Sequence, residues 1–249
     1  MPTLHLAEPF FALGDHIAID LPGARALFTT RRGGASEPPY DELNLGVLTA
    51  ADPAVARNLG LLEHELGVSL AFGRQVHGTA VRVAATSAAV DGELQIADAI
   101  ATTEPGIAPM VLAADCLPIA LAGAGVVAIV HAGWQGLAAG VLNAAARTVR
   151  ALARDGRGAA AAAIGPGAGV CCYEVGDELH MRFAARGEDF REGRHLDLKA
   201  IARAQLEAEG IGEIHDVALC TICSDPGAFF SHRRERGVTG RQAGIVWLN

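Results

Sequence analysis

Two apolar segments that each end in a metal-capable residue decide the fold class: VLAADC at residues 111–116 and VVAIVH at residues 126–131. Short continuous apolar runs of this kind predict strands that are buried on both faces. Residues at the ends of buried strands meet at one edge of a sheet, where ligands commonly bind in α/β proteins. The sequence therefore predicts a sheet-based fold with a binding site where these strands end.

Helical and strand patterns alternate on either side of these two segments. Asp52 and Pro53 predict a helix N-cap and first turn, and Gly67 closes the apolar helical pattern that follows. Residues 79–84 alternate as a strand does. After Gly133, apolar residues at helical spacing predict one long helix that ends near Leu152.

The C-terminal half continues the same alternation. Asp197 is a candidate cap for a helix that ends at Gly210, residues 245–248 predict a final strand, and the alanine tract 159–163 leads into another strand. The segment from Arg31 to Asn44 is rich in Gly, Pro and Ser and predicts an ordered loop. We expect a mixed α/β (α+β) fold in one domain over residues 1–249, with a central buried mixed sheet, flanking helices and a metal site at the strand ends.

Composition excludes several classes of protein. The chain has 249 residues, 51% of them hydrophobic, so a disordered chain is excluded. The formal net charge is -8 and no run of Lys or Arg occurs, which argues against a nucleic-acid surface. No uninterrupted apolar stretch is long enough to span a membrane, and the N-terminus lacks the pattern of a secretory signal. We expect a cytoplasmic protein.

The five cysteines form an odd set, which favours a reducing compartment over a disulfide framework. Cys220 and Cys223 have the spacing of a redox pair or half a zinc knuckle, but no second pair with that spacing follows. A buried, inert pair is the favoured interpretation. The adjacent Cys171 and Cys172 are most simply packing residues, with an approach to the metal as the alternative.

Three metal-capable residues lie at the predicted strand ends. Cys116 follows the first apolar segment, His131 ends the second, and His77 precedes the strand at 79–84. One thiolate and two imidazoles are suitable zinc ligands, and three protein ligands leave a fourth position for water or substrate. Their long separations match no short metal motif, so ordinary roles in packing and hydrogen bonding stay open on spacing alone.

The sequence motifs around these residues are more specific than the spacing between the residues. Seven short motifs occur in order along most of the chain: Asn44–Gly46, Gln75–Gly78, Ala114–Pro118, His131–Trp134, Gly165–Pro166, Cys172–Gly176, and Phe229–Ser231 with Thr239–Arg241. Together they resemble the YfiH/YlmD family of laccase-domain, or multicopper polyphenol oxidoreductase-like, proteins. The resemblance runs from about Arg31 to the C-terminus and implies the YfiH-like architecture.

The resemblance also implies a function and a set of ligands. It implies that His77, Cys116 and His131 bind zinc. It further implies that the substrates are purine nucleosides and phosphate, with phosphorolysis of adenosine, inosine and methylthioadenosine and hydrolytic deamination of adenosine. Gln135 departs from the family, which usually carries Arg there, so phosphate use is in question if that Arg binds an anion. His232 stands where Tyr is common.

Two acidic residues in the matched motifs are candidates for proton transfer. Deamination needs a group that moves a proton to the departing ammonia, and Glu174 and Asp115 are the nearest acidic residues by motif. Each has a structural alternative: Asp115 as a residue that orients a ligand, and Glu174 as a cap on a backbone turn.

Phosphorolysis requires an anion site that faces C1′ of the ribose. Arg31, Arg234 and Arg241 are candidates because the guanidinium group matches phosphate oxygens and all three lie in matched loops. Solvated surface charges are the alternative for each of them. Asn44 is a candidate for hydrogen bonding to the sugar or base, or for stabilising its own turn.

Three other functions compete with the zinc enzyme. Cys116 and His131 alone would suit a metal-free thiol hydrolase or deamidase, which has no evident use for His77. A copper polyphenol oxidase needs several His-rich sites, and nine scattered histidines without His-x-His pairs do not provide them. A non-enzymatic peptidoglycan quality-control factor is the third.

Overall fold

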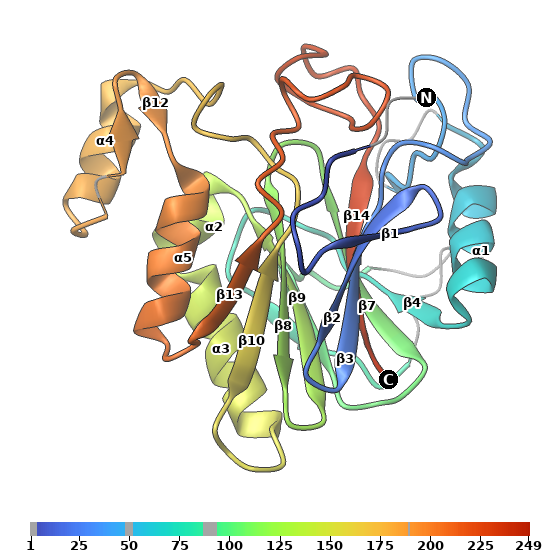
Figure 1. Ribbon diagram of the computed structural model, residues 1–249, viewed down its shortest axis with the longest axis horizontal. Coiled ribbons are helices and arrows are strands. Elements are labelled where there is room, and N and C mark those ends of the chain that lie inside the picture. The colour runs from blue at the N-terminus through green and yellow to red at the C-terminus, as the bar shows by residue number, and fades with distance from the viewer. Residues whose placement is uncertain (1–3, 48–51, 87–93, 189) are drawn as a thin grey trace.

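Two six-stranded sheets pack face to face at the centre of the part of the chain that the structure describes (Figure 1). The structure is a computed structural model that describes residues 4–47, 52–86, 94–188 and 190–249. In spatial order, the first sheet consists of β1 (Phe11–Leu13), β2 (His16–Leu21), β3 (Ala24–Phe28), β14 (Gln242–Leu248), β7 (Ile107–Ala113) and β4 (Ser69–Ala71).

The second sheet carries most of the candidate site. In spatial order it consists of β13 (Glu213–Asp216), β10 (Ala159–Ile164), β8 (Leu117–Gly123), β9 (Val126–Ala132), β6 (Ala99–Thr102) and β5 (Val81–Val83). Both sheets are mixed, because β4–β7, β10–β13 and β5–β6 pair in parallel while the other neighbours are antiparallel.

The second sheet is the middle layer of the molecule, which explains its continuous apolar strands. Along β8, Ala120 and Ala122 face the first sheet, whereas Ile119 and Leu121 face the helices on the other side. Successive side chains of a strand point to opposite faces, so a strand with a core on each side needs apolar residues at every position. The same alternation holds along β9 and β10.

The helices lie mainly on one side of this middle layer. α2 (Trp134–Ala139), α3 (Val141–Leu152) and α5 (Leu198–Ala208) cover its outer face, and α1 (Val55–Leu66) packs near β4 (Figure 1). α4 (Asp177–Ala184) and the ribbon of β11 (Arg191–Glu192) and β12 (His195–Leu196) lie at one end. In the described segments, no helix is long and apolar enough to cross a membrane.

The predicted mixed α/β class is confirmed, and several element boundaries agree with the sequence. α1 ends at Leu66, and its C-cap Gly67 has a left-handed conformation, as predicted. The predicted start of this helix is wrong, because its N-cap is Ala54 rather than Asp52; the Asp52 carboxylate accepts the backbone N–H of Ala54 just before the helix. The Asp197 carboxylate accepts the N–H groups of Lys199 and Ala200 and so caps α5, as its sequence position predicts.

Three further expectations need correction. The single helix after Gly133 is wrong, because Gly140 adopts φ 90° and separates α2 from α3. The alanine tract at 159–163 does not lead into a strand but forms most of β10 itself. The predicted single buried sheet is in fact two packed sheets. A strand that was not predicted, β8, lies in the chain between the segments that carry Cys116 and His131.

Candidate active site

The structure brings the side chains of His77, Cys116 and His131 together. Their potential ligand atoms all lie within 4.8 Å of one another, and Cys116 Sγ is 3.9 Å from His77 Nε2. Bond lengths of about 2.3 Å to sulfur and 2.1 Å to nitrogen would place these two atoms about 3.6 Å apart in a tetrahedral site. The thiolate and two imidazoles can therefore hold a metal ion with only small adjustments.

These three residues come from three separate parts of the chain. His131 is on β9, whose pairing with β8 sets Pro118 opposite His131 and brings Cys116, just before β8, alongside. His77 lies in the loop before β5. Gly133, just after β9, lies directly against this group, because a Cβ there would lie 2.8 Å from Cys116 Sγ. Only glycine fits at that position without displacing the sulfur.

Buried Asp98 organises both histidines. Its Oδ1 accepts the backbone N–H of His77 at 2.9 Å and lies 3.0 Å from His131 Nδ1. Its Oδ2 accepts the N–H groups of Val76 at 3.1 Å and Gly78 at 2.8 Å. A histidine held at Nδ1 by a carboxylate presents Nε2 to a metal. The sequence reading missed Asp98, although a lone carboxylate inside an apolar segment was a usable signal.

The electrostatics of the group favour a charged pair when no metal is bound. Burial raises the pKa of Cys116, but the charge and hydrogen bond of His131, together with His77, outweigh burial and lower that pKa to about 6. Burial lowers the pKa of His131, yet Cys116 and Asp98 raise it to about 9. The thiolate form, which is the form that binds metal, is thus stabilised near neutral pH.

A cavity of about 580 Å³ opens onto the three residues. Trp134, Tyr173 and Leu198 contribute apolar lining, and His232, Arg233 and Arg241 contribute polar groups. Its size falls within the usual range for small-molecule sites, which combine an apolar lining with a few polar groups. The cavity therefore suits a small, partly apolar ligand with polar substituents.

The two predicted proton carriers occupy different places. Asp115 lines the cavity, but its carboxylate accepts the Thr221 hydroxyl and the Arg233 backbone N–H, both at 2.7 Å. Glu174 pairs with Arg194 at 2.6 Å, has a side chain 47% exposed and is not among the residues that line the cavity.

Of the three predicted anion-binding arginines, Arg241 alone lines the cavity. Its Nη1 donates to the carbonyl groups of Thr239 and Gly240, which fixes the guanidinium plane. Burial lowers the pKa of Arg241, while the negative charges of Cys116 and Asp115 raise it. The cation is therefore partly desolvated close to the metal-binding group.

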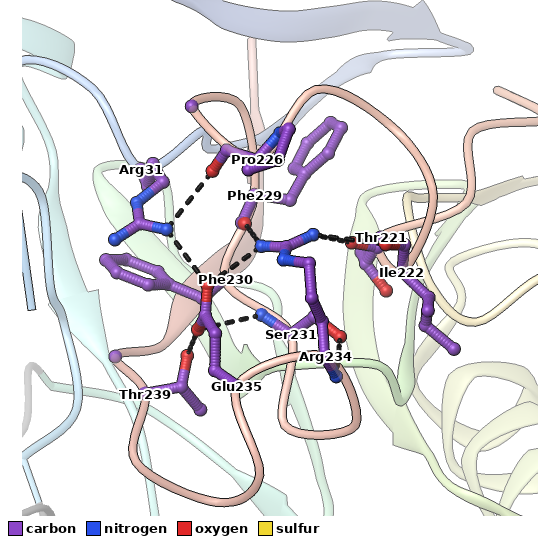
Figure 2. A network of polar contacts seen from close by, with 12 residues as sticks. Arg31, Thr221, Ile222, Pro226, Phe229, Phe230, Ser231, Arg234, Glu235 and Thr239 are labelled. Carbon is purple, nitrogen blue, oxygen red and sulfur yellow. Dashed lines mark hydrogen bonds and ion pairs between the residues drawn. The ribbon is translucent and has the colours of Figure 1, made fainter. Parts of the chain in front are cut away.

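Arg31 and Arg234 instead hold loops together around Glu235 (Figure 2). The Glu235 carboxylate accepts Arg31 Nη1 at 3.0 Å and Arg234 Nη2 at 2.9 Å, and Thr239 donates its hydroxyl to the same carboxylate. Asn44 has a comparable role, because its Oδ1 accepts the N–H group of Arg241. None of Arg31, Arg234 and Asn44 is among the residues that line the cavity.

Several lining residues were not proposed from sequence. Trp134 and Tyr173 lie within the matched motifs but carry no ionised group that would have singled them out. The Arg233 guanidinium lies 5.1 Å from the centre of the Tyr173 ring and donates to the Glu174 carbonyl. Gln135 is exposed on α2 and is not among the lining residues, so the departure at this position removes no group from the cavity.

A second group of metal-capable residues lies elsewhere. The sulfur atoms of Cys171, Cys172, Cys220 and Cys223 lie within 4.8 Å of one another. The prediction of a buried Cys220–Cys223 pair is right for Cys220 and wrong for Cys223, which is exposed, and both cysteine pairs meet in one cluster. Sequence spacing could not show that two loops about fifty residues apart converge.

Taken together, the structure defines a protein of mixed α/β architecture with a His–Cys–His group that could hold a metal ion. The chain belongs to the family described as multi-copper polyphenol oxidoreductase laccase, whose model matches residues 25–249. The predicted YfiH/YlmD resemblance is confirmed by solved structures. YfiH of Bacillus licheniformis has a TM-score of 0.86 at 31% identity and covers 98% of this chain and 100% of its own.

Two further proteins bear on the function. YlmD of Geobacillus stearothermophilus matches with a TM-score of 0.78 at 29% identity, over 94% of this chain and 96% of that chain. A Streptomyces coelicolor protein named purine nucleoside phosphorylase is 42% identical over 91% of this chain and 96% of its own length. Relatives with this name support a purine nucleoside enzyme role in the family.

Proposed function

We propose that this protein is a zinc-dependent enzyme that acts on purine nucleosides. Its principal reaction is phosphorolysis of adenosine, inosine and methylthioadenosine, and hydrolytic deamination of adenosine is a second activity of the same site. The observation that carries the proposal is the His77–Cys116–His131 group in a cavity of about 580 Å³. The names of the Streptomyces coelicolor relative and of similar relatives support phosphorolysis.

Zinc is the metal that the donor set favours. A thiolate with two imidazoles also suits copper, but blue-copper sites add a weak axial ligand that is usually methionine. No methionine is among the described residues that line the cavity. When bound, zinc supplies a Lewis acid beside the substrate, and the three protein ligands leave a coordination position for it.

The residues around the cavity have distinct tasks in phosphorolysis. Trp134 and Tyr173 provide apolar surface for the purine ring, and Arg241 binds the phosphate oxygens. In the reaction, a phosphate oxygen forms a bond to C1′ of the ribose as the bond from C1′ to N9 of the purine breaks. The departing purine gains the proton that the phosphate loses, so the products are the free base and a sugar 1-phosphate. The sugar product is ribose 1-phosphate from adenosine or inosine and 5-methylthioribose 1-phosphate from methylthioadenosine.

Deamination needs a group that moves a proton to the amine leaving from C6. Asp115 is the stronger of the two predicted carriers, because it lines the cavity whereas the Glu174 carboxylate pairs with Arg194. Exchange of Asp115 for Asn should lower deamination while the zinc content is unchanged. If deamination is unchanged, Asp115 has only a structural role, as the acceptor of the Thr221 hydroxyl and of the Arg233 backbone N–H.

The reaction is tested by product analysis with adenosine in the presence and absence of phosphate. Adenine with ribose 1-phosphate, formed only when phosphate is present, supports phosphorolysis. Inosine formed without phosphate supports deamination. Failure to form any of these products, by protein with zinc bound, would contradict the proposal.

A metal-free thiol hydrolase is the second candidate, and one observation favours it. Cys116, His131 and Asp98 lie in the order of a nucleophile, a base and a residue that orients the base. His77 separates the two functions because a Cys–His pair has no use for it. Activity that resists chelators but is abolished by thiol alkylation would support the hydrolase.

A further inference from the structure

The four-cysteine cluster lies outside the cavity of the proposed active site. It joins the loop after β10, which holds Cys171 and Cys172, to the loop after β13, which holds Cys220 and Cys223. None of the four is among the residues that line the active-site cavity. The proposed nucleoside chemistry makes no use of these thiols.

The spacing of the sulfur atoms matches a tetrahedral metal site. All four lie within 4.8 Å of one another, and Cys171 Sγ is 3.5 Å from Cys223 Sγ. Zinc–sulfur bonds of about 2.3 Å place the sulfur atoms of a tetrahedral site about 3.8 Å apart. Four thiolates leave no open position, which is the arrangement of a structural rather than a catalytic zinc site.

The backbone around Cys220 is arranged to stabilise a thiolate. The N–H group of Gly169 donates to Cys220 Sγ at 3.3 Å. Gly169 packs closely against the cluster, since a Cβ there would lie 3.2 Å from Cys171 Sγ and from Cys220 Cβ.

The turn that carries Cys220 and Cys223 is also held from outside the cluster. Arg234 donates through Nη1 to the carbonyl groups of Thr221 at 2.6 Å and Ile222 at 3.4 Å (Figure 2). The turn is therefore shaped before any metal binds.

We infer that Cys171, Cys172, Cys220 and Cys223 form a second, structural zinc site. This site would hold together the loop after β10 and the loop after β13, both of which are connected to the active-site region. Tyr173, which lines the cavity, directly follows Cys172. Thr221, inside the Cys220–Cys223 turn, donates its hydroxyl to Asp115, the residue before Cys116. Zinc bound to the four thiolates would thus fix both Tyr173 and the Asp115 contact.

The experiment measures zinc in protein purified with a thiol reductant, by elemental analysis. The wild type is compared with the double variant Cys171→Ser/Cys223→Ser and with Cys116→Ala. Both substituted residues in the double variant are exposed, so the fold should tolerate serine there. We expect the double variant to lose one equivalent of zinc, and Cys116→Ala to lose a different equivalent while it keeps the cluster's metal.

Cobalt substitution identifies the ligands independently of activity. Cobalt bound to four thiolates gives intense sulfur-to-metal charge-transfer absorption, which should persist in Cys116→Ala and disappear in the double variant. Equal zinc content in the wild type and the double variant would overturn the inference. So would a native Cys171–Cys223 disulfide, seen as a mass two hydrogens lower and as thiols that resist alkylation until reduced.

Discussion

Asp98 contacts both histidines of the His77–Cys116–His131 group: its Oδ1 accepts the backbone N–H of His77 and lies 3.0 Å from Nδ1 of His131. Exchange of Asp98 for Asn keeps the size but removes the charge that orients His131. Loss of such a partner typically lowers metal affinity about 10- to 100-fold. We expect a decrease of this size in zinc affinity, measured by competition with a chromogenic chelator.

The matched control for this variant is Asp20→Asn, which alters an exposed carboxylate that pairs with Arg25. Its zinc affinity should equal that of the wild type. If Asp98→Asn also binds zinc as the wild type does, Asp98 serves only to shape the loop at residues 76–78.

Arg241 is the residue that we propose binds phosphate. Lysine keeps the charge but not the fork of donors that matches phosphate oxygens, so Arg241→Lys should raise the KM for phosphate. A lost charge-assisted hydrogen bond of about 1.5–3 kcal/mol corresponds to about 10- to 100-fold. Initial rates at varied phosphate test this, and deamination, which needs no phosphate, should change much less.

Gln135→Arg is the companion variant, because it restores the residue that the family usually carries. Gln135 is exposed and is not among the cavity-lining residues, so the KM for phosphate should not change. A lower KM in Gln135→Arg, with no effect of Arg241→Lys, would place the anion site on α2 instead.

At the scale of elements, two glycines with opposite roles show why the helix boundaries were partly mispredicted. Gly140 separates α2 from α3 with φ 90°, whereas Gly60 lies inside α1 with open space where a Cβ would be. Both occur within apolar patterns of helical spacing. Periodicity cannot tell a glycine that needs a left-handed backbone from one that is merely tolerated.

The same pair provides a stability test. Gly140→Ala should lower the free energy of unfolding by about 1–2 kcal/mol, because an L-residue there is strained. Gly60→Ala should raise it by about 0.5–1 kcal/mol, because alanine favours the helix interior. Urea unfolding followed by circular dichroism measures both. Equal effects of the same sign would show that α2 and α3 can form one continuous helix.

At the scale of the whole molecule, Glu235 joins distant parts of the chain. Its carboxylate binds Arg31 and Arg234 (Figure 2). Burial raises the pKa of Glu235, but Thr239, Arg234, the Ser231 N–H and Arg31 outweigh burial and lower it below the ordinary 4.5. The stabilisation is therefore present above pH 4.5 and is lost as the pH falls through the lowered pKa.

Glu235→Gln tests this linkage. At pH 7 the variant should be less stable than the wild type by about 2 kcal/mol, in line with the loss of hydrogen bonds to a charged group. The difference should shrink as the pH falls below 4.5, because the unfolded wild-type chain then binds a proton at Glu235 that the folded protein binds only at its lowered pKa. Urea unfolding at a series of pH values measures it, and a constant difference down to pH 3 would be the opposite result.

The features that could be predicted from sequence are those that depend on residues close together in the chain. Local signals sufficed for the cap at Asp197, the end of α1 at Gly67 and the mixed class. The division into two sheets depends on pairings such as β14 with β3, which join the two ends of the chain. The four-cysteine cluster was missed because its two halves are distant in sequence. Asp98 had a local signal, a carboxylate inside an apolar segment, but its partner His131 is 33 residues away.

The most direct test of the central claim is the metal dependence of adenosine phosphorolysis, with the wild type beside His77→Ala. The wild type should lose ribose 1-phosphate formation when its zinc is removed by a chelator and regain it when zinc is added back. His77→Ala should bind zinc weakly at this site and remain nearly inactive, because one of three protein ligands is gone. Full activity of metal-free wild type, retained in His77→Ala, would contradict the zinc enzyme and leave the Cys116–His131 pair as the reactive centre.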